Sequence, residues 1–306
     1  MTPAVPQVLL AALLFGTTGT AQALGPDGTT PLGVGAVRLA VGGLALLAVL
    51  PLLGGSPRAA AALWRTPAGL LAGLCTALYQ VCFFAGVERA GVALGTLVTI
   101  GSGPIFAGLL AAALLHERPA RSWAAATGLC VAGLALLTLS GLTRSADSNS
   151  SDMVGIALAL VSGLAYAAYT VAAKHLISSG RPSTEVMAAS FGLGGVLLLP
   201  LLAVQPLSWL GTPGGGVLAL YLGLVTTTVA YVLFGRGLAV LPAGPVTTLV
   251  LAEPLVATAL GVGLLDERLD ALGALGAGVV LAGLLVQGVV ASGVRRSEAR
   301  VPPVAI

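Results

Sequence analysis

Long apolar segments separated by short polar interruptions run along the whole chain. A bilayer core about 30 Å thick needs about 20 apolar residues per helix, and charged residues, prolines and glycine clusters interrupt the apolar runs at that spacing. The pattern predicts ten transmembrane helices, over residues 7–24, 31–53, 67–87, 91–115, 121–141, 153–176, 185–204, 215–238, 244–265 and 271–292. We therefore expect an all-α integral membrane protein.

Composition supports this fold class. Of the 306 residues, 57% are hydrophobic and 8% are charged, against about 25% charged in soluble domains. A soluble fold of this size could not bury so much apolar surface. The 43 glycines suit membrane helices, where small residues let two backbones approach closely.

The two halves of the chain repeat each other at one ungapped offset of 150 residues. Chance similarity between apolar segments rarely matches the scarce letters Pro, Gly, Glu and Arg at a single offset. The offset places residues 100–104 on 250–254, 114–118 on 264–268, Gly128 on Gly278, and 131–134 on 281–284.

Each repeat has five predicted helices, and because five is odd, equivalent helices cross the membrane in opposite directions. The two repeats are therefore expected to be inverted. A polar stretch with Asp147, Ser148 and Asn149 lies near the midpoint. The expected organisation is a first five-helix repeat at 5–142, a linker at 143–152, a second repeat at 153–293 and a tail at 294–306.

The distribution of positive charge predicts the orientation. With the N-terminus inside, cytoplasmic helix ends carry ten basic residues and external ends carry three, which places both termini in the cytoplasm. The chain is expected in the cell (inner) membrane. Ala21-Gln22-Ala23 imitates a signal-peptide cleavage site, but Lys and Arg are missing before Arg38. We expect the first segment to remain as a helix, since its loss would break the repeat.

The sequence resembles the drug/metabolite transporter superfamily, and within it the EamA-type transporters with two five-helix repeats. The resemblance is carried by the Pro104 and Pro254 helices, which end in Leu-Leu-His-Glu-Arg and Leu-Leu-Asp-Glu-Arg. Arg38, the Glu253-Pro254 pair and the Leu-Pro-Ala-Gly turn at 241–244 also match. The resemblance implies a secondary transporter of small metabolites, often an exporter, and leaves the substrate open.

Two ionisable residues lie deep within predicted spans, where such a group needs a partner or a function. At 1.5 Å per residue, Arg38 lies about 10 Å from the outer surface and Glu253 about 13 Å from the inner one. Their levels differ by only about 6 Å in a core of about 30 Å. One interpretation is that Arg38 binds a substrate carboxylate, while Glu253 binds an amine or a proton. The other is a buried ion pair that holds two helices together.

Pro104 and Pro254 each remove a backbone hydrogen bond near mid-span and are expected to kink their helices. In transporters built from inverted repeats, such interruptions meet at the binding site; a simple packing kink is the alternative. The other candidate substrate-binding residues are polar or aromatic groups on neighbouring helices: Tyr79, Gln80, Ser102, Tyr166, Tyr169 and Tyr231.

The remaining patterns limit the alternatives. The scattered basic residues do not form a nucleic-acid surface, and the three cysteines have neither metal-ligand nor disulfide spacing. A phosphate-binding loop is missing, and Lys174 is the only lysine. We expect no cofactor, no metal and no nucleic acid, with a small molecule, protons and the bilayer as partners of a monomer or homodimer. The main alternative function is an intramembrane enzyme acting on a lipid-linked substrate, for which Glu253 would be the only deep acid.

Overall fold

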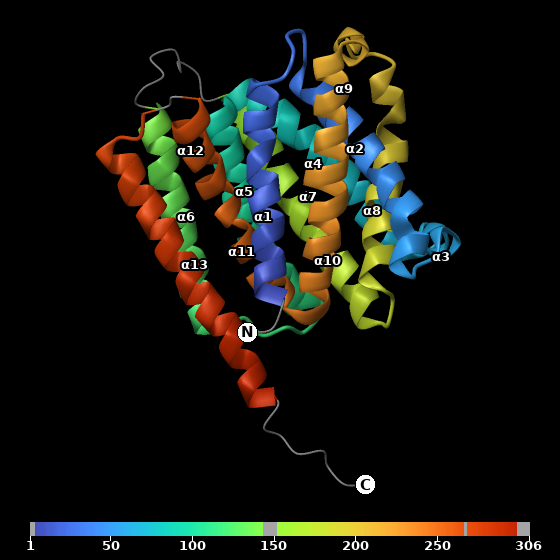
Figure 1. Ribbon diagram of the computed structural model, residues 1–306. Helices are drawn as coiled ribbons and strands as arrows, with labels where there is room; N and C mark the ends of the chain where they lie inside the picture. Colours follow the sequence, from blue (N-terminus) through green and yellow to red (C-terminus); the bar gives the residue numbers. More distant parts are fainter. Residues whose placement is uncertain (1–3, 143–151, 266–267, 299–306) are drawn as a thin grey trace.

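A computed structural model describes residues 4–142, 152–265 and 268–298 of the chain. These residues form a bundle of helices with no strand (Figure 1). Ten helical segments among them are long and apolar enough to cross a membrane. The linker from 143 to 151 and the Asp266-Glu267 part of the repeated Glu-Arg motif lie outside the described residues.

The first half contains α1 (Ala4–Ala23), α2 (Pro31–Val49) extended by η1 (Leu50–Leu53), α3 (Pro57–Leu63), α4 (Pro67–Ala90), α5 (Val92–Leu114) and α6 (Arg121–Leu142). The second half contains α7 (Met153–Ser178), α8 (Ser183–Leu202), η2 (Ser208–Gly211), α9 (Pro213–Leu220), η3 (Tyr221–Val229), α10 (Ala230–Val240), α11 (Ala243–Val250), α12 (Ala252–Leu264) and α13 (Ala271–Glu298). The predicted spans agree with these bounds to within one helical turn, except that α13 continues beyond 292.

Several helices begin at the same short sequence signal, a Ser or Thr followed by Pro. The hydroxyl of Thr30 accepts a hydrogen bond from the Gly33 N–H at 3.1 Å, and Thr66 and Thr212 cap α4 and α9 in the same way. The capping oxygen satisfies a backbone donor that has no partner within the helix. Proline fits the next position because its missing N–H would be unpaired there anyway.

The predicted inverted repeat is confirmed at the packing of α6 against α13, which lie side by side in Figure 1. The Cys130 thiol lies 3.7 Å from the carbonyl oxygen of Val280, a residue 150 positions away and therefore its own repeat equivalent. Gly133 faces Gly276 and Val280, while Gly283 faces Ala126 and Cys130. Residues with higher numbers on α6 thus contact residues with lower numbers on α13, so the two equivalent helices are antiparallel.

The core is formed mainly by buried side chains of α1, α7, α8, α10 and α11. Large leucines on the outside of the bundle remain exposed, for example Leu44, Leu109 and Leu285. Exposed leucines of this kind suit a surface in contact with lipid. The start of α1 and the end of α13 lie at the same end of the bundle (Figure 1).

Two spans of the second half are irregular. The eighth is a single path through α9, η3 and α10, and its middle section η3 is a π-helix. The ninth is divided into α11 and α12 at Leu251, shortly before Pro254. In the equivalent helix of the first half, α5 continues through Pro104. The predicted interruption is therefore a break in one repeat and an unbroken helix in the other.

Candidate functional site

A cavity of ≈ 310 Å³ lies between the two repeats. Its walls come from α1, α2, α4, α5, α7, α10 and the α11–α12 span. Gln22, Pro31 and Val92 are among the lining residues and lie at the helix ends opposite the start of α1. The cavity, hereafter the central cavity, thus extends from mid-span toward that end, which the predicted orientation places outside.

Arg38 is held in the cavity wall by the π-helical section of the opposite repeat. Its Nε donates a hydrogen bond to Thr227 Oγ1 at 3.2 Å. Thr227 in turn donates to the carbonyl of Leu222, five residues earlier, as the wider turn of a π-helix allows. The backbone near Arg38 is also fixed, because Gln80 Nε2 donates to the Gly35 carbonyl at 3.3 Å.

Glu253 reaches the same cavity from the break in the ninth span. It lies in the first turn of α12, directly after the interruption at Leu251. Its carboxylate and the Arg38 guanidinium both line the cavity and interact electrostatically. Although both residues are described, no ion pair of 4.0 Å or less joins them. The structure therefore brings the two charges to one cavity as separate groups.

Aromatic side chains form much of the remaining wall. Six of them line the cavity: Phe15, Tyr79, Phe83, Phe84, Tyr166 and Tyr231. Successive rings touch, with centroids 4.9 Å apart for Phe15 and Tyr231 and 5.7 Å apart for Tyr79 and Tyr166. Such a wall offers apolar surface and the negative faces of aromatic rings to a bound molecule.

Helix α1 contributes the polar groups that its sequence suggests. Thr18 and Gln22 line the central cavity, while Thr17 accepts a hydrogen bond from the Tyr221 hydroxyl at 2.8 Å. Among the described residues, the buried hydroxyl oxygens of Thr18 and Tyr166 have no hydrogen-bond partner. Because an unpaired buried hydroxyl is costly, these two groups are suited to bind a ligand in the cavity.

Of the eight candidate binding residues, six line the cavity: Arg38, Tyr79, Gln80, Tyr166, Tyr231 and Glu253. The other two lie elsewhere. Tyr169 is fully buried and packs its ring against Tyr166 and Phe191. Ser102 donates to the Thr99 carbonyl at 3.3 Å and packs against Gly163 of α7. Neither Pro104 nor Pro254 lines the cavity, although Gly103 beside Pro104 packs against the Tyr166 ring.

Phe15, Phe83 and Phe84 line the cavity and Thr227 holds Arg38, and the sequence alone identifies none of these roles. The sequence does not show whether a phenylalanine in an apolar segment faces a cavity or the lipid. The run Thr226-Thr227-Thr228 is visible in the sequence, but threonines often bond their own helix. Only the π-helical geometry identifies the one that faces Arg38.

A model of the EamA-like transporter family matches residues 2–139 and 153–288. An uncharacterized transporter of Bacillus subtilis is 41% identical over 279 residues, which is 90% of each chain. A protein of Streptantibioticus cattleyicolor named as a probable terminal-alkyne amino-acid exporter is 28% identical. The alignment covers 99% of this chain and 98% of that relative. A solved structure with 20% identity superposes with a TM-score of 0.77 over 96% of this chain and 99% of that chain, and supports the fold.

Proposed function

Since the chain belongs to the EamA-like transporter family, we propose that this membrane transporter exports a small zwitterionic metabolite, an amino acid or a similar molecule, through the central cavity. Transport proceeds by alternating access, in which the two repeats rock around the cavity. The driving force is the proton gradient, with Glu253 as the proton-carrying group.

The observation that carries this proposal is the placement of Arg38 and Glu253 in one cavity without an ion pair between them. A guanidinium matches a carboxylate through charge-assisted hydrogen bonds, and a carboxylate matches an ammonium group. The two charges complement the two ends of an amino acid. The aromatic wall adds apolar surface for a side chain.

The relatives support the same class of substrate. One is named as a probable terminal-alkyne amino-acid exporter and aligns over 99% of this chain. The relative with 41% identity is named as a transporter without a substrate. An intramembrane enzyme remains the alternative, and no group of His, Cys, Asp and Glu among the described residues is arranged to hold a catalytic metal.

A proteoliposome assay tests the proposal. The purified protein is reconstituted, and uptake of a panel of amino acids and other metabolites is measured with and without an imposed pH gradient. We expect saturable uptake of at least one zwitterion that increases with the gradient and is lost in Arg38→Ala and Glu253→Gln.

Two charge-matched variants serve as controls. Arg58→Gln and Glu88→Gln remove exposed charges outside the central cavity and should transport normally. Uptake that survives Glu253→Gln with an unchanged gradient response would exclude the proton role. If no zwitterion moves and the protein instead modifies a lipid-linked substrate, the transport proposal fails.

We also propose that the protein lies in the inner membrane with both termini in the cytoplasm. The start of α1 and the end of α13 lie at one end of the bundle, and most helix-end basic residues share that end. A protease-accessibility assay on inverted and right-side-out vesicles, with a tag at each terminus, distinguishes the two orientations.

A further inference from the structure

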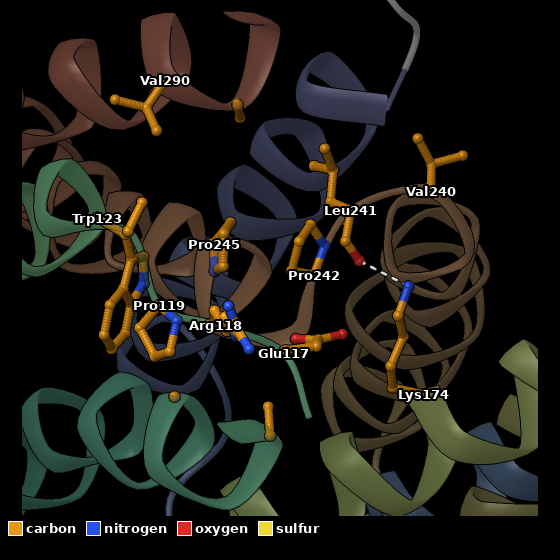
Figure 2. Close-up of a pocket in the computed structure, with 15 residues that line it drawn as sticks. Glu117, Arg118, Pro119, Trp123, Lys174, Val240, Leu241, Pro242, Pro245 and Val290 are labelled. Atoms are coloured by element: carbon orange, nitrogen blue, oxygen red, sulfur yellow. Dashed lines mark hydrogen bonds between the residues drawn. The ribbon is translucent and has the colours of Figure 1, made fainter. Parts of the chain in front are cut away.

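A second pocket of ≈ 220 Å³, hereafter the inner pocket, lies at the opposite end of the bundle from the mouth of the central cavity. Figure 2 shows its residues, which come from α5, the 117–120 turn, α6, α7, the α10–α11 turn and α13. Most of the wall is apolar. The charged groups are Glu117, Arg118 and Lys174.

The inner pocket and the central cavity are stacked along the same helices. On α7, Tyr166 lines the cavity and Lys174 lines the pocket; on α10, Tyr231 and Val240 do the same. At 1.5 Å per residue these pairs lie about 12–14 Å apart along the helix axes. Helices α5 and α11 also line both chambers.

The material between the chambers is a layer of packed side chains. On the shared helices, three residues lie between the cavity-lining and the pocket-lining positions: Tyr169, Phe234 and Leu249. Each of them is fully buried. Two chambers on one axis, separated by a closed layer, are the arrangement expected of a transport path that is shut between its two ends.

The charges of the inner pocket are arranged to receive an anionic group. Lys174 Nζ donates to the carbonyls of Leu238 and Leu241, both at 2.9 Å, which leaves one of its three N–H groups. One oxygen of Glu117 accepts from the Ala243 N–H at 3.0 Å. Arg118 is exposed and forms no ion pair with any described residue. The pocket therefore has two cationic groups and one carboxylate that already caps a helix.

We propose that the inner pocket is a second binding site, at the cytoplasmic end of the transport path, where Arg118 and Lys174, drawn on either side of the Glu117 carboxylate in Figure 2, bind the carboxylate end of a small organic molecule. This rests on the proposed function, since the pocket is where an exported molecule would first meet the protein. Apolar surface from Trp123, Pro245 and Val290 receives the rest of the molecule.

Binding at this site would also loosen the inner end of the path. The Lys174 and Glu117 hydrogen bonds together hold the turn between α10 and α11, and Figure 2 marks the bond from Lys174 to Leu241. A carboxylate that binds the remaining N–H of the ammonium draws Lys174 away from the two carbonyls, because the charge-assisted hydrogen bond is the stronger one. Occupancy of the inner pocket thus weakens the hydrogen bonds that hold the turn between α10 and α11.

Trp123 gives a direct readout of the site. Its ring lines the inner pocket, and its Nε1 donates to Thr248 Oγ1 at 3.0 Å. Tryptophan fluorescence is measured on the full chain in phosphatidylcholine nanodiscs during titration with L-leucine, with 4-methylpentanoate, which lacks the amine, and with L-leucinol, which lacks the carboxylate. The signal assigned to the pocket is the part that disappears in Trp123→Phe.

We expect L-leucine and 4-methylpentanoate to saturate this signal and L-leucinol to leave it unchanged. A charge-assisted hydrogen bond corresponds to about a tenfold change in affinity, so Arg118→Gln should weaken both carboxylates by about tenfold. Arg118 is exposed, so this variant should fold even if Lys174→Gln does not. Arg58→Gln, which removes an exposed arginine outside the pocket, should leave the signal intact.

The outcomes separate this inference from the proposed function. If the reconstituted protein transports a zwitterion while no carboxylate up to tens of millimolar changes the Trp123 signal, the second site is excluded and transport stands. A saturable Trp123 signal without transport of any substrate keeps the site and rejects the transport proposal. A signal that appears only when phosphatidylglycerol is added to the nanodiscs assigns the pocket to a lipid headgroup and overturns the inference.

Discussion

Arg38 and Thr227 join the two repeats at the wall of the central cavity, where the guanidinium Nε donates to the threonine hydroxyl at 3.2 Å. The threonine occupies this place because η3 is π-helical, which shifts its side chain relative to an α-helical course. The hydrogen bond restricts a long, flexible side chain to one orientation over the cavity.

Replacing Thr227 by Val should therefore weaken substrate binding without removing the charge of Arg38. A hydrogen bond to a charged group contributes about 1.5–3 kcal/mol, so the KM for uptake should rise by about 10- to 150-fold. Thr226→Val is the matched control, since Thr226 is also buried and donates to the same Leu222 carbonyl, whereas Arg38 Nε donates to Thr227. Equal transport kinetics of the two variants would contradict a positioning role for Thr227.

Glu253→Gln should separate coupling from substrate exchange. If the carboxyl group carries the proton, the amide variant cannot respond to a pH gradient, because it neither gains nor loses a proton. Exchange of labelled for unlabelled substrate at equal pH needs no net proton movement and should persist with a raised KM, because the amide oxygen can still accept a hydrogen bond from the substrate ammonium group. Both rates can be measured in the same proteoliposomes. Loss of exchange at saturating substrate, together with loss of coupling, would assign Glu253 to substrate binding alone and exclude a separate proton-carrying role.

The packing of α6 against α13 depends on glycine where the two backbones meet. A Cβ at Gly133 would lie 2.6 Å from Val280 N and 2.7 Å from Gly276 O. Overpacking of this kind costs about 1–3 kcal/mol, so Gly133→Ala should lower the melting temperature in detergent. Gly128 lies on the same helix with nothing within 4 Å of its Cβ position, and Gly128→Ala should leave the melting temperature unchanged or raise it.

Where α4 ends and α7 begins, an exposed ion pair joins Asp152 to Arg89. Asp152 Oδ2 accepts from Arg89 Nε at 2.7 Å, and its Oδ1 accepts from the Val154 N–H at 2.9 Å. The hydrogen bond from Arg89, followed by that from Val154, lowers the pKa of Asp152. A carboxyl whose pKa is lower in the folded state stabilises the fold above its unfolded pKa, and this stabilisation is lost as the pH falls through the folded pKa.

The melting temperature of Asp152→Asn should consequently lie slightly below that of the unmodified protein at neutral pH. The difference in melting temperature should shrink as the pH falls from about 3.9, the ordinary pKa of Asp, toward the lower pKa of Asp152 in the folded protein. Asp27→Asn, in the exposed turn between α1 and α2, is the control. A difference that stays constant down to pH 3 would contradict a stabilising role for the ionised carboxylate.

The fold could be predicted from the sequence because the two patterns that define it each extend over many residues. Apolar runs of membrane length define the ten spans, and the 150-residue offset identifies Val280 as the equivalent of Cys130, which the structure then places in contact. The helix starts are also readable, since Thr30-Pro31 and similar pairs are capping signals.

The irregular features could not be predicted, because they arise from packing between distant helices. The π-helix around Thr227 depends on close contact with Gly42 and Val41 of α2. The break at Leu251 lies within one turn before Pro254, where a proline weakens a helix, but α5 is unbroken at the equivalent Pro104, and the sequence does not distinguish the two. Trp123, which resembles an interfacial anchor by its place at a helix end, instead packs against Gly108 and Gly244.

The contact between Cys130 and Val280 has a consequence for how this chain arose. Where a residue meets its own equivalent, the two halves present the same surface to each other, as subunits do in a symmetric dimer. A five-helix ancestor able to insert in both orientations would pair through this face, and fusion of two copies would preserve the pairing. The two halves, expressed as separate polypeptides, should still recognise each other through the face of α6 and α13.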